Sequence, residues 1–233
     1  MKKYLYSILT VMVAATLAGC SNDDDELYVQ PSAKGTMTDD QGNEYGWVRI
    51  GNLDWTTSNA KNGTPFYGHI YEDNGYRYYT FLSSLQPTLR DEYMPEYGNL
   101  MMYDDAIASA PAGWRVPTDD DWKDLERALG IKDADATGWR NGASALMQQG
   151  DEGTGLHLQL GGGIMRADIS SATLKDMHFK EMGYYWSSTP DPQSSVEGDV
   201  VFFRRLTFGH DAVDRGSCSV QRYMSVRWVR DAR

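Results

Sequence analysis

The segment AGWRVPTDDDWKDLERALGI, residues 112–131, carries the clearest helix signal of the chain. Thr118 can cap the amide three residues further on, and Asp121 stands where a capping box places its reciprocal partner. Gly130 can end the helix in a left-handed conformation. Three apolar residues fall on one face at helical spacing: Trp122, Leu125 and Leu129. We therefore expect a helix that starts at Thr118, and we interpret the aspartates 119–121 as its first turn rather than as a metal site.

The rest of the chain contains one further helix signal and several short strand signals. A short helix is expected over residues 104–110, ended by Pro111. Segments with strand composition lie between turn signals, at residues 45–50, 53–55, 78–82, 156–160, 184–187, 200–203 and 225–229. Together these patterns predict an α+β domain in which two helices flank short antiparallel strands.

The N-terminus has the pattern of an export signal. Lys2 and Lys3 precede an apolar run that is too short to span a membrane, and residues 17–20 read LAGC. A cysteine directly after small residues resembles the lipobox of bacterial lipoproteins. That resemblance implies cleavage before Cys20 and acylation of Cys20, with palmitate among the chains, so that the protein is anchored to a membrane. An ordinary secretory signal is the alternative.

The acidic run at residues 22–26 has two compatible interpretations. Consecutive like charges cannot be buried, so the run can be a solvated spacer. It also resembles the signal that sends Bacteroidota lipoproteins to the outer face of the outer membrane, which implies a cell-surface location. We divide the chain into a signal peptide (1–19), an acidic flexible tether (20–35) and a globular domain (36–233).

Composition excludes some classes of partner. The chain has 33 acidic and 22 basic residues and a net charge of −11, which argues against binding nucleic acid or lying flat on anionic lipid. With Cys20 acylated, Cys218 has no partner for an internal disulfide. We interpret Cys218 as a small buried apolar residue rather than a nucleophile.

Four ordered segments carry a family resemblance. They are residues 40–55, residues 112–118 with Trp122 and Leu125 after them, GYYWSST at 183–189 and SVRWVRD at 225–231. They resemble the Fibrobacter succinogenes major paralogous domain, although Trp228 stands where many relatives have cysteine. The resemblance implies a C-type-lectin-like fold, related to the formylglycine-generating group, in surface lipoproteins with no established catalysis.

The motifs of known chemistry are missing from the sequence. The histidines His69, His157, His178 and His210 are scattered singly, with no two at ligand spacing on one expected element. Residues 133–138 mimic the start of an EF-hand loop, but Ser144 stands where the bidentate glutamate is required. No nucleophile elbow or phosphate loop occurs. We therefore expect no metal, no cofactor and no enzymatic activity.

Surface recognition remains, and two segments are candidates for it. Residues 208–217 read as a polar loop whose His210, Asp211 and Arg215 can contact sugars or proteins. The tyrosine-rich segment 67–79 offers Tyr71 and Tyr76, whose rings are large, rigid and polar at the tip. The alternatives are an ordinary solvated loop and packing of the second segment on its own domain.

We expect a lipid-anchored module that adheres to an unknown glycan or protein at the cell surface. Three alternatives stay open at this point. The chain could be a structural component of a surface or fimbria-like assembly, a metal-dependent enzyme on the formylglycine-generating type of fold, or the variable target of a diversity-generating retroelement.

Overall fold

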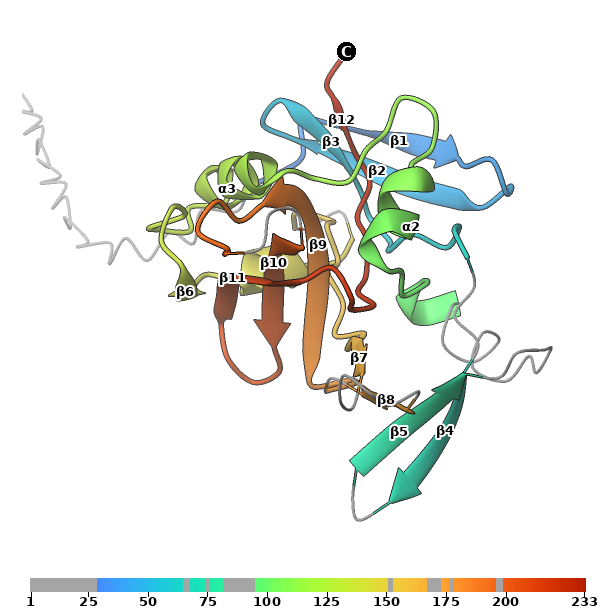
Figure 1. Cartoon of the computed structure of the whole chain (residues 1–233). Helices are drawn as coiled ribbons and strands as arrows, with labels where there is room; N and C mark the ends of the chain where they lie inside the picture. Colours follow the sequence, from blue (N-terminus) through green and yellow to red (C-terminus); the bar gives the residue numbers. More distant parts are fainter. Residues whose placement is uncertain are drawn as a thin grey trace, which may run out of the picture.

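The computed structural model describes residues 29–64, 68–73, 76–81, 95–150, 153–166, 173–176, 178–195 and 199–233. Its strands form three four-stranded antiparallel sheets within these residues (Figure 1). The first sheet has the order β1 (Ala33–Thr38), β2 (Glu44–Ile50), β3 (Leu53–Thr56), β12 (Val229–Asp231). The second has the order β6 (Gly138–Asn141), β11 (Ala212–Ser219), β10 (Val200–Thr207), β9 (Met182–Pro190). The third has the order β4 (Gly68–Asp73), β5 (Tyr76–Phe81), β8 (Thr173–Asp176), β7 (Ile164–Arg166).

The expected α+β architecture, with two helices flanking short strands, is wrong. The named helices of the described residues are α2 (Tyr103–Ala108), α3 (Asp119–Ala128) and α4 (Ser144–Met147), and strands make up most of the remaining regular structure. Pro111 and Gly130 end the helix signals after few turns, whereas the aromatic and β-branched residues of the second half pair as strands of up to nine residues. None of the described helices is long and apolar enough to cross a membrane.

The local predictions for the two helices are confirmed. Thr118 caps α3 by accepting a hydrogen bond from the Asp121 amide at 3.1 Å, and the Asp121 carboxylate accepts one from the Thr118 amide at 2.6 Å. Gly130 follows α3 with φ +78°. The shorter predicted helix is α2, which starts at Tyr103.

At the N-terminus β1 begins at Ala33, ahead of the domain start expected at residue 36.

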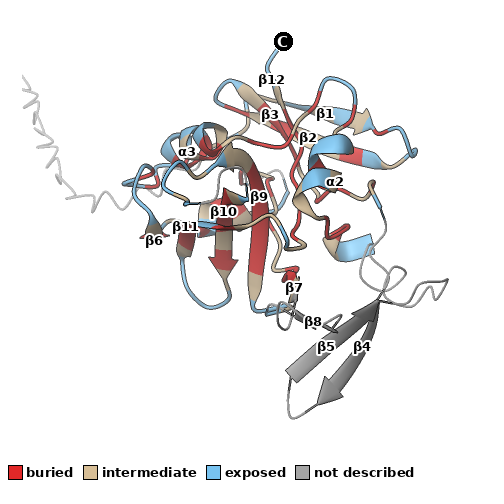
Figure 2. Cartoon of the chain, in the orientation of Figure 1, coloured by how far each residue is buried: buried red, intermediate tan, exposed pale blue. Residues whose placement is uncertain are grey.

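The C-terminal segment, residues 224–229, lies between the first two sheets and is buried throughout (Figures 1 and 2). Its backbone bonds to both sheets: the Thr56 amide at the end of β3 donates to Trp228 O at 3.0 Å, and the Ser225 amide donates to Tyr184 O on β9 at 3.0 Å. Only residues 229–231 form a regular strand, although the sequence predicts a strand from residue 225. This segment joins the two sheets by pairing with each in turn.

The core consists of two apolar clusters that meet at β9. Because side chains alternate along a strand, Tyr184 and Trp186 enter one cluster and Tyr185 the other. Cys218 is buried in the first cluster as a free cysteine, and burial raises the pKa of its thiol to about 12. The interpretation of Cys218 as a buried apolar residue is confirmed.

Helix α3 is held on the second sheet by buried ion pairs. Asp119 accepts hydrogen bonds from Arg204 at 2.8 Å and from Arg215 at 2.7 Å. Glu126, about two turns further along the same face of α3, pairs with Arg204 at 2.5 Å and with Arg140. Burial alone would raise the pKa of Asp119, but Arg215 and Arg204 lower that pKa to about 2. The two buried carboxylates of α3 are therefore neutralised by arginines that project from the second sheet.

We expect Asp119→Asn to lower the free energy of unfolding at pH 7 by about 3 kcal/mol, because it leaves the buried guanidinium of Arg215 without a carboxylate and that of Arg204 with Glu126 alone. The pKa of Asp119 lies below its unfolded value of about 3.9, so its contribution is present above that pH and is lost as the pH falls toward 2. Urea unfolding between pH 7 and pH 2 measures both effects.

The neighbouring substitution Asp120→Asn is the matched control. Asp120 is exposed and its carboxylate pairs with Lys123, a surface ion pair of the kind that contributes little, so we expect a change below about 0.5 kcal/mol. Equal losses for the two variants would contradict the role assigned to Asp119.

Candidate functional site

The turn between β10 and β11 brings two of the predicted binding residues, His210 and Asp211, beside the edge strand β6. Together with the strand ends they border a surface hollow of about 540 Å³. The residues that line it are Trp139, Asn141, Thr207, His210, Asp211 and Ala212. We call this hollow and its six residues the Trp139 platform.

The platform lies on the face of the second sheet opposite α3. Antiparallel register places Trp139 of β6 opposite Asp214 of β11, Asp214 opposite Arg205 of β10, and Arg205 opposite Tyr184 of β9. These four side chains therefore form a row across the sheet. The inner end of the row enters the core at Tyr184, and its outer end reaches the surface at Trp139.

Arg205 fixes the position of the Trp139 ring. Its guanidinium lies over the indole at 4.7 Å from the ring centroid and pairs with Asp214 at 2.8 Å. A cation on one face of the ring contributes about 0.5–1 kcal/mol at an exposed site. The indole is therefore oriented by the protein before any ligand arrives.

Exposed aromatic surface distinguishes this region. Trp139 is 45% exposed, and Phe208, at the start of the adjoining turn, is 73% exposed. Large rings left in water forgo the stabilisation that burial gives, so exposed rings beside polar groups make this surface a candidate for recognition. The polar groups here include the Asn141 amide, the Thr207 hydroxyl and the His210 imidazole.

Asp211 is held in place by the backbone at the start of α4. Its carboxylate accepts a hydrogen bond from the Ser144 amide at 2.5 Å, and its carbonyl accepts one from the Gly142 amide at 3.0 Å. The turn that carries His210 is thereby tied to the segment that follows β6. This contact keeps the two borders of the hollow together.

The structure does not bring Arg215 to this site. Arg215 projects from the opposite face of β11, where it pairs with Asp119 and lies over the Phe202 ring at 4.1 Å. Tyr71 lies on β4 opposite Tyr78, and Tyr76 lies on β5 opposite Asp73. The side chains of Tyr71 and Tyr76 are not part of the described structure. Cys20 also lies outside the described residues.

Sequence reasoning missed Trp139 and Arg205, the two residues on which the platform depends. A signal was present, since Gly138 and Gly142 bracket a short alternating run with one large ring. The pattern could not show that Arg205 would lie beneath that ring, because this contact depends on the register of three strands. Within the described residues no three His, Cys, Asp or Glu side chains converge to hold a metal ion.

The comparisons with known proteins give one clear result. The model of a family described as the Fibrobacter succinogenes major domain matches residues 48–230. The family expected from the four motif segments is therefore confirmed. No curated protein and no solved structure matches the chain, and the C-type-lectin-like fold implied by the resemblance is not confirmed.

We expect Trp139→Ala to lower the free energy of unfolding by only about 1–2 kcal/mol, because the ring is nearly half exposed and the contact with Arg205 is a modest one. Trp186→Ala is the comparison, since Trp186 is fully buried and its removal costs about 3–5 kcal/mol. Urea unfolding of both variants checks this. A large loss for Trp139→Ala would mean that the ring serves the fold rather than the surface.

Proposed function

Because the chain belongs to the Fibrobacter succinogenes major domain family, whose description names no activity, we propose a function from the site itself. We propose that this protein is a non-catalytic binding module that recognises a glycan with the Trp139 platform. The observation that carries the proposal is the exposed indole of Trp139, held from below by Arg205.

The chemistry of the platform suits a sugar ring. An indole offers a flat apolar surface on which the C–H face of a sugar can pack, and a ring already oriented loses little conformational freedom on binding. Asn141, Thr207 and His210 offer donors and acceptors to the hydroxyl groups around such a ring. A few polar groups around an apolar surface are typical of small-ligand sites.

The location of the module is also a proposal. The basic start, short apolar run and LAGC motif support export and acylation at Cys20, and the acidic residues 22–26 support display on the outer face of the outer membrane. The first sheet begins with β1 at Ala33, so residues 21–32 would connect the anchor to the folded domain. In this arrangement the protein acts as an adhesion module held at the cell surface.

A glycan array probed with the purified protein tests the proposed binding. We expect a defined set of glycans to bind, and we expect Trp139→Ala to reduce their signal at least tenfold, because stacking area is lost at the centre of the site. Ile107→Ala is the matched control, since Ile107 is an exposed apolar residue on α2. Unchanged binding by Trp139→Ala would contradict the proposal.

Fractionation of cells that express the protein tests the anchor. We expect the wild-type chain in the outer-membrane fraction, labelled by a fatty-acid probe, and Cys20→Ala in the soluble fraction without label. External protease should degrade the wild-type protein on intact cells. Membrane association of Cys20→Ala equal to that of the wild type would show that Cys20 is not the anchor.

A further inference from the structure

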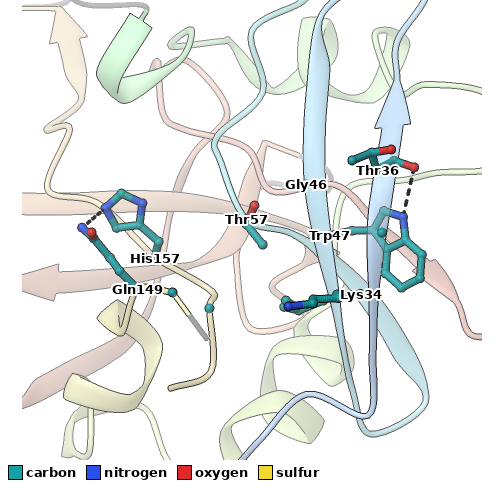
Figure 3. Close-up of a pocket in the computed structure, with 11 residues that line it drawn as sticks. Lys34, Thr36, Gly46, Trp47, Thr57, Gln149 and His157 are labelled. Carbon is teal, nitrogen blue, oxygen red and sulfur yellow. Dashed lines mark hydrogen bonds between the residues drawn. The ribbon is translucent and has the colours of Figure 1, made fainter. Parts of the chain in front are cut away.

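A second hollow, of about 500 Å³, lies between the first sheet and the segment around His157 (Figure 3). One wall is formed by β1, β2 and Thr57, and the other by Gln149, Gly150, Gly155 and His157. The polar side chains that line it are Lys34, Thr36, Thr57, Gln149 and His157. We call this hollow the His157 groove.

The shape of the groove depends on a close approach at Gly46. A Cβ atom at Gly46 would lie 2.7 Å from Thr57 Oγ1. Glycine at this position therefore leaves room for the Thr57 side chain beside the β2 backbone. The Thr57 amide donates to Gly46 O at 2.9 Å, which fixes the approach. The Thr57 hydroxyl is thus placed at the border of the groove.

A buried positive charge lies directly behind the groove. Arg227 is 1% exposed, and its guanidinium donates to four neutral acceptors: Asn59 Oδ1, Thr56 O, Leu156 O and His157 O. No carboxylate of the described residues pairs with it. These hydrogen bonds engage four of the five guanidinium N–H groups but leave the charge without a counter-ion, which is costly in a protein interior.

His157 connects this charge to the groove. Its backbone has φ +49°, which is rare for a residue with a Cβ and concentrates at functional positions. Its carbonyl accepts from Arg227, and its amide donates to Gln148 O at 3.0 Å. Burial, and then the charge of Arg227, lower the pKa of His157, against a weaker opposite effect of Glu96, so the ring is neutral at pH 7.

The neutral ring leaves one N–H available to a ligand. Gln149 Nε2 lies against His157 Nε2, which as the acceptor leaves the proton on Nδ1. Figure 3 shows this second ring nitrogen turned away from Gln149, on the side of Thr57. Within the described part of the chain, Nδ1 makes no hydrogen bond. The Nδ1–H donor of His157 therefore faces the groove, and the buried guanidinium of Arg227, which has no carboxylate partner among the described residues, bonds to the carbonyl of the same residue.

We infer that the His157 groove binds the carboxylate of a sugar acid. The carboxylate would accept from His157 Nδ1 and would supply the negative charge that Arg227 lacks, while Thr36, Thr57 and Gln149 meet the hydroxyl groups of the sugar. This site lies on other elements than the Trp139 platform, and the inference does not depend on the function proposed for that platform.

Titration of the full chain with sodium glucuronate at pH 7 tests the inference, with the histidine ring nitrogens followed by NMR. We expect a saturable shift of the His157 resonances, while His178 and His210 stay unchanged. Glucose, which lacks the carboxylate, and N-acetylalanine, which carries it on a peptide-like group, should each bind at least tenfold more weakly. No shift with glucuronate, or equal binding of either comparison compound, would overturn the inference.

Two sets of variants complete the test, with calorimetry as the readout. His157→Asn keeps a residue that tolerates positive φ but removes the ring, and should weaken glucuronate binding about tenfold or more. His178→Asn is the matched control, since His178 has φ +57° and lies outside the groove. Equal affinities in these two variants would contradict the site.

The sequence continues from Gly150 with Asp151 and Glu152, which lie outside the described residues. Replacing both by their amides removes two negative charges that follow the groove residue Gly150 in the sequence, so glucuronate should bind as tightly or more tightly. Weaker binding in that double variant would overturn the inference. Trp139→Ala should leave glucuronate binding unchanged, which separates failure of the groove from failure of the platform.

Discussion

The guanidinium of Arg227 is the contact on which the rest of the structure depends. It bonds to Thr56 at the end of β3 and to Leu156 and His157 on the neighbouring segment, and it lies 6.0 Å from the Tyr185 ring centroid on β9. One side chain thus joins the first sheet, the second sheet and the border of the His157 groove. Burial lowers its pKa, yet an arginine keeps its proton, so the interior holds a permanent charge.

The two faces of the second sheet differ in what covers them. One face is closed by α3, whose Asp119 and Glu126 neutralise arginines of the sheet. The other face is covered near Tyr184 and open at the edge strand, where Trp139 emerges. The binding surface that we propose is therefore the uncovered edge of the second sheet. The rest of that sheet is held in place by the apolar core and by the ion pairs with α3.

The sequence predicts what is local and misses what depends on strand register. The capping box of α3 and its end at Gly130 follow from neighbouring residues, and both are present. His210 and Asp211 are found together because they are adjacent in one turn. Arg215 could not be placed, since only strand pairing decides which face of β11 it occupies. The alternation of Leu156 and Leu158 predicts a strand. Between them, however, the backbone at His157 is left-handed, and the His157 carbonyl accepts a hydrogen bond from Arg227.

The role of Arg227 is tested most directly by urea unfolding of Arg227→Lys at pH 7. Lysine keeps the charge but lacks the planar fork that reaches four acceptors in different directions. We predict that the free energy of unfolding falls by about 3 kcal/mol or more, while the exposed Arg233→Lys stays within about 0.5 kcal/mol of the wild type. A loss below about 1 kcal/mol for Arg227→Lys would contradict this view of the fold.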